Sequence, residues 1–277
     1  MRVPIVDQFV LRDSIDDPLA EAERVAEEGV TPIINRLGEH HTDTSEVNKT
    51  VSEYKDVIGD ISEMGFDAEL SIKPTQIGLD IDPAIFESNI EEIVDEAVKE
   101  GIFVWIDMES YETKQKTLEI YKNLVQEYSS VGICLQANIR DTIEDLEELG
   151  ELDTSHVRLV KGAYDEPEGV AYQDRDEVTE ELSNLIVKAV ENVDGRIAVA
   201  SHDNQIIQFA LAEAASDIEF QMLRGIREEK QQELAESHTV GQYIPYGNEW
   251  VAYTYRRLRE RPRNIFLIGR AVKDKIR

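Results

Sequence analysis

The chain has 277 residues, 41% of them hydrophobic, which is enough apolar material for a folded core and excludes a disordered chain. Its formal net charge is −29, from 58 Asp and Glu against 29 Lys and Arg. So negative a surface repels nucleic acid and anionic lipid headgroups, which excludes both as main partners and leaves at most transient membrane contact.

The chain repeats one unit: a short apolar run rich in β-branched residues, a polar or glycine-containing stop, and a longer segment with helical periodicity. An extra N-terminal helix is expected at about 18–28. The runs predicted as strands cover residues 31–37, 68–75, 102–108, 131–137, 156–162, 196–202, 218–225 and 241–247. The helices expected between and after them cover residues 45–64, 84–100, 112–129, 141–149, 176–193, 204–215, 226–236 and 248–261.

Continuous apolar strands that alternate with helices indicate a parallel sheet covered on both faces. Eight such units predict an α/β protein with a closed (βα)8 barrel rather than an open doubly wound sheet. The G-x-G-x-x-G fingerprint of an open dinucleotide-binding sheet does not follow the first strand. Because no linker rich in Pro, Gly or Ser divides the chain, we expect residues 1–277 to form a single domain.

Polar side chains stand near the carboxyl end of nearly every predicted strand, and in a barrel these ends all meet on one face. They are Lys73, Asp107, Gln136, Arg158, Lys161, His202, Gln221 and Tyr243. Each one alone is more often an ordinary loop or strand-end residue, but so many together indicate a site. Lys73 and Asp107 come from neighbouring units and are expected to form an ion pair at the barrel mouth.

Arg158 alternates with apolar neighbours in "HVRLVKG", so we expect it inside the barrel, where it needs an anionic or acceptor partner. Gly162 and Ala163 follow, and two small residues let a bulky ligand approach the backbone; a plain turn is the alternative. His202 suits a base, a stacking surface or a metal ligand. No second ligand stands at a suitable spacing, and "GEHHTD" at 38–43 is interpreted as an exposed loop, so no metal site is predicted.

The C-terminal stretch "AYTYRRLRERPRN" gathers arginines in this acidic chain. If 248–261 is a helix, one of its faces carries Tyr253, Arg256 or Arg257, and Glu260. Adjacent arginines turned toward the barrel mouth would bind a small carboxylate bidentately, with Tyr243 and Tyr253 as aromatic walls. A solvated basic patch that pairs with the acidic surface is the alternative.

The single cysteine, Cys134, cannot form an intrachain disulfide and is interpreted as a small buried hydrophobe. No signal peptide opens the chain and no run approaches the ~18 apolar residues of a membrane span, so we expect a cytoplasmic protein, with a peripheral place at the inner face of the membrane left open. The acidic excess indicates adaptation to high salt, because screening ions weaken self-repulsion; an ordinary, very soluble protein is the alternative.

A set of motifs in this order resembles the proline dehydrogenase family, particularly its monofunctional members. They are "SIKPTQIGLDID", "VWIDMES", "VRLVKGAY", "ASHDN", "EFQMLRG" and "YIPYGNEWVAYTYRRLRE", and the similarity runs from about residue 30 to 264. The resemblance implies a distorted (βα)8 barrel that binds FAD at its carboxyl face. Two positions depart from the family pattern: Ser201 stands where threonine is frequent, and Arg224 where an aromatic residue is common.

The resemblance also implies roles for individual residues. Asp107 and Arg158 resemble the polar pair at the catalytic centre, and the positions implied for substrate are Lys73, Tyr243, Tyr253, Arg256 and Arg257. The positions implied for the cofactor are Met108, Gln136, Lys161, Gly162, Ala163, Ser201, His202 and Glu260, the last as a residue that organises the site. The implied reaction is hydride transfer from L-proline to FAD, which gives 1-pyrroline-5-carboxylate, with a quinone as electron acceptor.

Two other functions stay open at this point. A Schiff-base aldolase would use Lys73 or Lys161 as a nucleophilic amine at a strand end. A non-catalytic barrel that binds a carboxylate would show ligand binding without flavin or turnover. The sequence does not distinguish a monomer from a homo-oligomer, nor does it say whether hydroxyproline is accepted.

Overall fold

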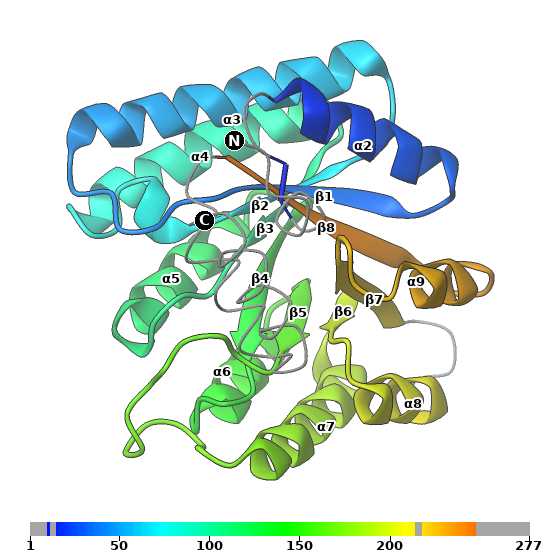
Figure 1. Ribbon diagram of the computed structural model, residues 1–277. Helices are drawn as coiled ribbons and strands as arrows, with labels where there is room; N and C mark the ends of the chain where they lie inside the picture. Colours follow the sequence, from blue (N-terminus) through cyan, green and yellow to red (C-terminus); the bar gives the residue numbers. More distant parts are fainter. Residues whose placement is uncertain (1–9, 12–14, 214–217, 248–277) are drawn as a thin grey trace, which may run out of the picture.

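The computed structural model describes residues 10–11, 15–213 and 218–247. Its strands form a closed barrel in which each strand pairs in parallel with the next along the chain, and the last pairs with the first (Figure 1). The strands are β1 (Thr31–Arg36), β2 (Glu69–Ile72), β3 (Phe103–Ile106), β4 (Val131–Gln136), β5 (Val157–Val160), β6 (Ile197–Ala200), β7 (Ile218–Leu223) and β8 (Val240–Tyr246). The predicted (βα)8 barrel is therefore confirmed.

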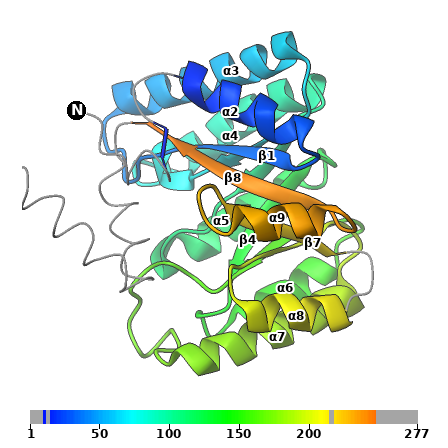
Figure 2. The ribbon, with the colours of Figure 1, turned by 45° about the vertical axis from the view of Figure 1, so that its right-hand side comes forward.

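The helices lie outside the strands and cover them (Figures 1 and 2). They are α2 (Asp16–Glu27), α3 (Thr44–Met64), α4 (Pro83–Lys99), α5 (Tyr111–Leu124), α6 (Thr142–Gly150), α7 (Arg175–Asn192), α8 (Asn204–Glu213) and α9 (Glu228–Ala235), with a 3-10 turn η1 (Pro74–Gln76) after β2. Each expected helix up to residue 236 is present, whereas 248–261 lies outside the described residues.

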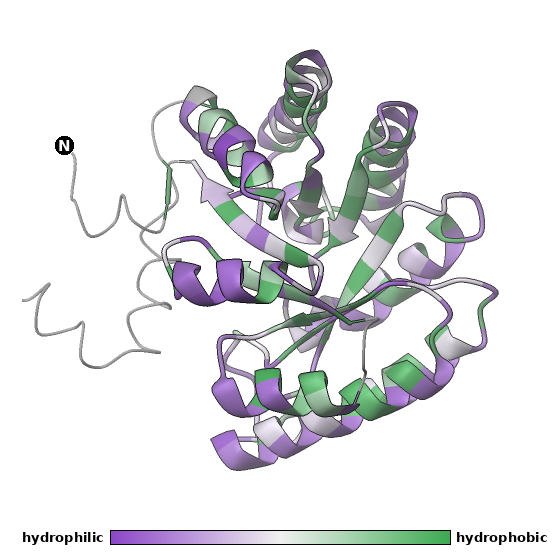
Figure 3. Cartoon of the chain, turned by 90° about the vertical axis from the view of Figure 1, so that its right-hand side faces the viewer, coloured by the Kyte–Doolittle hydropathy of each residue, from purple (hydrophilic) through white to green (hydrophobic). Residues whose placement is uncertain are grey.

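Local signals set the boundaries of these elements. Helix α4 begins after Asp82, whose carboxylate accepts from the backbone N–H of Ala84, and Pro83 occupies its first turn. Strand β2 ends at Ile72, earlier than expected, because Pro74 has no N–H for the ladder and begins η1 instead. Figure 3 shows hydrophilic and hydrophobic residues within the same helix. This is the pattern of an amphipathic helix, which packs one face on the core and leaves the other in solvent.

The main core fills the space between the barrel and its helices, while a smaller set of apolar side chains fills the barrel itself. Inside the barrel, Trp105 is fully buried with Ile33 and Ala198. Gly132 on the neighbouring strand leaves room for the indole, because a Cβ there would lie 2.5 Å from a Trp105 ring carbon. Cys134 and Met222 are buried, as expected.

The extra N-terminal helix, α2, packs against β1 and β8 (Figure 2). Arg224 at the end of β7 reaches this helix, and its Nε donates to Glu21 Oε1 at 3.0 Å. The side chains of both residues are mostly buried, so the pair links α2 to the barrel. Arg224, which departs from the family pattern, thus serves here as a tether for α2.

The expectation of an exposed loop at 38–43 is wrong for part of that segment. His41 is buried, its backbone N–H donates to Thr75 O at 3.1 Å, and its ring lies 3.3 Å from Thr50 Oγ1. His40 adopts a positive φ of 60° and its ring bonds to Asp80. Although most residues of this stretch are polar, the loop folds back onto η1.

Within the described ranges, none of the helices has the length and apolarity that crossing a membrane requires.

Candidate active site

Asp107 lies at the centre of a buried polar cluster just beyond the carboxyl end of β3. Its Oδ1 accepts from Arg158 Nη1 at 2.8 Å, and its Oδ2 lies 3.4 Å from Lys73 Nζ. The two cations come from β5 and from the end of β2, so three strands that are separate in sequence meet here. The expected ion pair of Lys73 with Asp107 and the inward orientation of Arg158 are both present.

Two hydroxyl groups complete the surroundings of Asp107. Ser71 Oγ donates to Oδ1 at 2.7 Å, and Tyr243 OH donates to Oδ2 at 3.0 Å. Ser71 Oγ in turn accepts from Arg158 Nη1 at 2.8 Å. Both carboxylate oxygens therefore have two partners each, which fixes the side chain and leaves it poorly placed to take up a proton.

The charges in this cluster stabilise one another. Burial disfavours the ionised form of Asp107, but Lys73 and Arg158 outweigh it and hold the pKa of this carboxyl below its usual range. Burial likewise opposes the charge on Lys73, yet its pKa is raised well above the usual value by Tyr164, Tyr243 and Asp107. Lys73 is thus an ammonium ion at neutral pH, and this counts against its use as a Schiff-base nucleophile, which must be a free amine.

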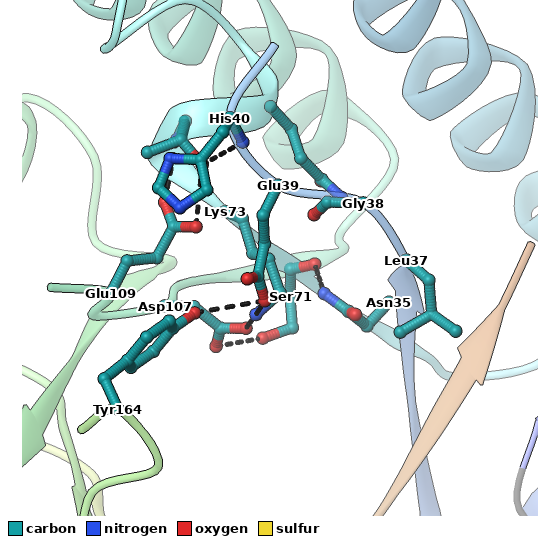
Figure 4. A network of polar contacts seen from close by, with 12 residues as sticks. Asn35, Leu37, Gly38, Glu39, His40, Ser71, Lys73, Asp107, Glu109 and Tyr164 are labelled. Atoms are coloured by element: carbon teal, nitrogen blue, oxygen red, sulfur yellow. Dashed lines mark hydrogen bonds and ion pairs between the residues drawn. The ribbon is translucent and has the colours of Figure 1, made fainter. Parts of the chain in front are cut away.

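The loops after β1, β3 and β5 close around Lys73 (Figure 4). Glu39 Oε1 lies 3.8 Å from Lys73 Nζ and accepts from Tyr164 OH at 3.1 Å. Glu109 is buried and accepts from the backbone N–H and the hydroxyl of Thr75. Sequence reasoning missed these loop residues, although "GEHH" directly follows one predicted strand and "KGAY" covers the end of another.

Side chains on β4, on β5 and in the loop after β4 contain buried polar atoms that lack a hydrogen-bond partner among the described residues. They are Gln136 Oε1, Asn138 Oδ1 and Arg158 Nη2. The amide nitrogen of Gln136 is engaged, since it donates to the carbonyl oxygens of Met108 and Glu109. These atoms offer two acceptors and one cationic donor to a ligand.

Gly162 stands beside the same group and has a φ of +100°. A Cβ at this position would lie 1.9 Å from Asn138 Oδ1, so only glycine fits without displacing that side chain. Ala163, the next residue, is exposed, whereas Met108 is buried. The backbone directly after β5 therefore carries no large side chain at Gly162 and Ala163.

Three further predicted cofactor positions, Lys161, Ser201 and His202, directly follow β5 and β6. Lys161 Nζ donates to Thr179 Oγ1 at 2.6 Å and pairs with Asp203 Oδ2 at 2.7 Å. Ser201 Oγ accepts from the backbone N–H of Asp203, and His202 Nε2 accepts from that of Leu223. This corner combines a lysine, a serine hydroxyl and a histidine ring, which suit an anionic or polyhydroxylated part of a ligand.

Four predicted site residues lie outside the described residues: Tyr253, Arg256, Arg257 and Glu260. Among the described residues, the other predicted positions stand at or just after strand ends, except Arg158 and Tyr243, which lie within β5 and β8 and reach Asp107 with their side chains. Over that part, no group of three or more His, Cys, Asp or Glu side chains is arranged to hold a metal ion.

A closed (βα)8 barrel that gathers a buried ion-pair cluster at its carboxyl face defines the chain as an α/β-barrel enzyme. The comparisons specify its family. Residues 19–264 match the proline dehydrogenase family. The chain belongs to that family, and the sequence-based prediction of a proline dehydrogenase is confirmed.

Two curated relatives illustrate the similarity. Proline dehydrogenase 1 of Bacillus subtilis (strain 168) is 36% identical over 276 residues, which cover 97% of this chain and 90% of the relative. The proline dehydrogenase of Deinococcus radiodurans is 31% identical over 272 residues, 94% of this chain and 87% of the relative.

Among solved structures, proline utilization A (PutA) from Bdellovibrio bacteriovorus matches with a TM-score of 0.84 and 24% identity. The match covers 91% of this chain and 32% of that one, so the chain spans about a third of the length of the PutA protein. This similarity shows that the two share the barrel fold.

Proposed function

We propose that the chain oxidises L-proline to 1-pyrroline-5-carboxylate with FAD as the hydride acceptor. The observation that supports this most directly is the buried cluster of Lys73, Asp107 and Arg158 beside unpartnered polar atoms, in a chain that belongs to the proline dehydrogenase family. A single oxidation of a ring amine removes one hydride from carbon and one proton from nitrogen, and so balances the two-electron reduction of one flavin.

The donors and acceptors of the site fit the flavin ring. An isoalloxazine carries both acceptor atoms and an N–H donor along its polar edge, which matches the free oxygens of Gln136 and Asn138 and the free Nη2 of Arg158. Gly162 provides the bare backbone that a flat ring needs. We assign the ring to these residues with Met108 and Ala163, and the remainder of FAD to Lys161, Ser201 and His202, with Glu260 organising the site.

Bound at these residues, FAD would supply a two-electron acceptor for the hydride that leaves the ring carbon next to nitrogen. The protein must hold that carbon in place and keep the ring nitrogen unprotonated. Positive charge from Lys73 and Arg158 lowers the pKa of a nearby amine and so favours its neutral form. Tyr243 forms one wall, and its hydroxyl is fixed on Asp107.

We propose a positioning role for Asp107 rather than a role as base. Its oxygens are shared among Arg158, Ser71, Lys73 and Tyr243, so the carboxylate holds these side chains in one arrangement. The proton from the substrate nitrogen then passes to water or buffer.

The proline carboxylate is assigned to Arg256 and Arg257, with Tyr253 as a second wall. Guanidinium groups bind a carboxylate bidentately and stay charged at every accessible pH. We expect Arg256→Ala to raise the KM for proline at least about tenfold, equivalent to ~1.4 kcal/mol of binding. An unchanged KM would exclude the assignment.

The proposal includes a quinone as the acceptor from reduced flavin, reached through at most transient membrane contact because the chain is so acidic. Turnover with a water-soluble quinone that greatly exceeds turnover with oxygen would support it. Cosedimentation with lipid vesicles that resists high salt would contradict the transient contact.

The test of the reaction is an absorbance spectrum of the purified protein before and after anaerobic addition of L-proline. A flavin band that bleaches supports the proposal, and a flavin band that ignores proline excludes the substrate. If no flavin is bound even after incubation with FAD, the flavoenzyme is excluded, and borohydride trapping with an aldehyde or ketone then tests the aldolase.

A further inference from the structure

The barrel interior carries a second set of buried charges beneath the site, at the amino ends of the strands. Arg196, just before β6, donates from Nη2 to Glu69 Oε1 and to Glu219 Oε2, both at 2.6 Å. Trp105 Nε1 donates to the other oxygen of Glu69 at 2.7 Å. Glu69 and Glu219 are 6% and 5% exposed, so both carboxylates lie in the interior and depend on these partners.

Gln221 connects this lower set to the site above. Its Nε2 donates to Glu219 Oε1 at 2.7 Å, and its Oε1 accepts from Arg158 Nε at 2.5 Å. Gln221 is 3% exposed, as is Arg158. A continuous series of hydrogen bonds therefore runs through the barrel from Arg196 by way of Glu219 and Gln221 to Arg158 and Asp107.

The direction of these bonds fixes the orientation of the Gln221 amide. Both oxygens of Glu219 accept hydrogen bonds, one from Arg196 and one from Gln221. A carboxylate offers only acceptors, so the NH2 group of Gln221 must face Glu219 and its oxygen must face Arg158. If the amide turned over, its NH2 group would face the N–H of Arg158 Nε, and two donors would be opposed without an acceptor between them.

The same contacts fix the plane of the Arg158 guanidinium. Nε is held by Gln221 and Nη1 by Ser71 and Asp107, while the group lies over the Trp105 ring with Cζ 4.6 Å from the ring centroid. Arg196 lies near the same ring at 5.3 Å. With two nitrogens and the plane held, Nη2 has a single direction, and it is the nitrogen without a partner among the described residues.

We propose that Glu219 and Gln221 are positioning residues for the reaction: together they orient Arg158 so that its Nη2 faces the reacting ring and the flavin. This inference rests on the proposed function, because it assigns Arg158 Nη2 to that ligand. Glu219 lies near the amino end of β7 and Gln221 in its middle, so the proposal gives a role to two residues that do not contact the ligand themselves.

The test compares Glu219→Gln and Gln221→Leu with a double variant, Glu219→Gln with Gln221→Glu, that exchanges the two side chains. The exchange preserves the net charge and every donor–acceptor match, because an amide at 219 can donate to a carboxylate at 221, which then accepts from Arg158. The control is Gln242→Leu, since Gln242 is a buried glutamine on β8 whose amide donates to Gln231 on α9, away from the site.

We expect Glu219→Gln and Gln221→Leu to lower kcat about tenfold with the KM for proline within about twofold, because Arg256 and Arg257, assigned to the proline carboxylate, are unchanged. The dissociation constant for FAD, measured on apoprotein by flavin fluorescence, should rise in both. The exchanged variant should recover most of kcat and FAD affinity, and Gln242→Leu should lower the melting temperature alone.

Single variants with wild-type kcat and FAD affinity, or an exchanged variant no better than Glu219→Gln, would overturn the positioning role. If a single variant does not fold, the kcat and FAD affinity of the exchanged variant are compared with those of the wild type, and values far below wild type would overturn the positioning role. A wild-type protein that binds FAD but does not oxidise proline would refute the proposed function instead, and the FAD affinities of the variants would still test the orientation of Arg158.

Discussion

Arg158 and Asp107 form an ion pair of 2.8 Å inside the barrel, where their side chains are only 3% and 10% exposed. The pair joins β5 to the end of β3 across an intervening strand, β4, on the inside of the closed barrel. Removing one partner from such a pair leaves a buried charge without compensation, which costs about 3–5 kcal/mol of folding free energy.

Asp107→Asn should therefore lower both stability and activity. The amide cannot neutralise Lys73 and Arg158, so both cations shift, and a misplacement of about 1 Å at a reacting centre lowers kcat/KM on the order of 100-fold. Steady-state kinetics and urea unfolding would measure the two effects.

Asp145→Asn is the matched control. Asp145 pairs with Lys114 at 2.6 Å between α5 and α6, and neither is a predicted site residue; Lys114 keeps Asp141 as a second partner at 2.8 Å. The control should lose some stability and retain kcat/KM. Equal kcat/KM in the two variants would contradict the role given to Asp107.

The fold could be predicted because short apolar runs alternate eight times with segments of helical periodicity. This pattern is typical of a closed (βα)8 barrel. The site was predictable where a polar residue ends a strand, as Lys73 and Asp107 do, since barrel closure alone brings strand ends together. Arg158 could be placed inside the barrel because its neighbours in sequence are apolar.

The charges at the strand starts could not be predicted in this way. Glu69, Arg196 and Glu219 stand at the amino ends of apolar runs, where charged residues usually mark the surface, and Glu69 contacts Arg196 only across the barrel interior. The contact of Glu39 with Tyr164 depends on two loop conformations, one of which includes the positive φ of His40. The hydrophobic periodicity of the sequence does not predict such contacts.

His156 should make stability sensitive to acid. Its Nδ1 accepts from the backbone N–H of Arg196 at 2.9 Å, and its Nε2 lies 3.0 Å from Ser129 O. Burial and the charge of Arg196 lower the pKa of His156, while the bond to Ser129 opposes them. The folded pKa of His156 lies below the unfolded value of about 6.5. The stability that the neutral His156 ring contributes is therefore fully present above pH 6.5 and is lost as the pH falls through the folded pKa.

Urea unfolding of the wild type and His156→Gln at pH 7.5 and 5 would check this. The variant should be less stable at pH 7.5 and lose less stability at pH 5. His40→Gln is a control of opposite sign, because a hydrogen bond to Asp80 raises the pKa of His40, and its contribution is present below about pH 6.5 and lost as the pH rises. Equal pH slopes for the wild type and His156→Gln would refute the prediction.

Salt should raise the melting temperature. The formal charge of −29 repels itself at low ionic strength, and some acidic side chains of one helix, such as Glu92 and Glu96 on α4, share a single cation, Lys55 on α3. The Debye length falls from about 10 Å at 0.1 M to about 3 Å at 1 M salt, so repulsion across the surface is screened. Thermal unfolding in KCl between these concentrations would measure the effect. A melting temperature that stays level or falls would refute adaptation to salt.

Gly162→Ala should prevent normal FAD binding. A Cβ there would overlap Asn138 Oδ1, and a φ of +100° costs a residue with a side chain about 1–3 kcal/mol. Displacing Asn138 would also disturb the place assigned to the flavin ring. We expect the FAD dissociation constant of the apoprotein to rise at least about 100-fold, because the loss of contacts and the backbone strain add together.

Gly169→Ala is the matched control for this change. Gly169 lies in the same loop after β5, and a Cβ there meets nothing within 4 Å, so FAD affinity and melting temperature should match those of the wild type. Adding Asn138→Ala to Gly162→Ala should relieve the overlap but leave the backbone strain. Part of the stability lost in Gly162→Ala should then return, while FAD affinity stays low because the Asn138 oxygen is gone. Full FAD affinity in Gly162→Ala alone would show that the flavin does not approach the backbone at this point.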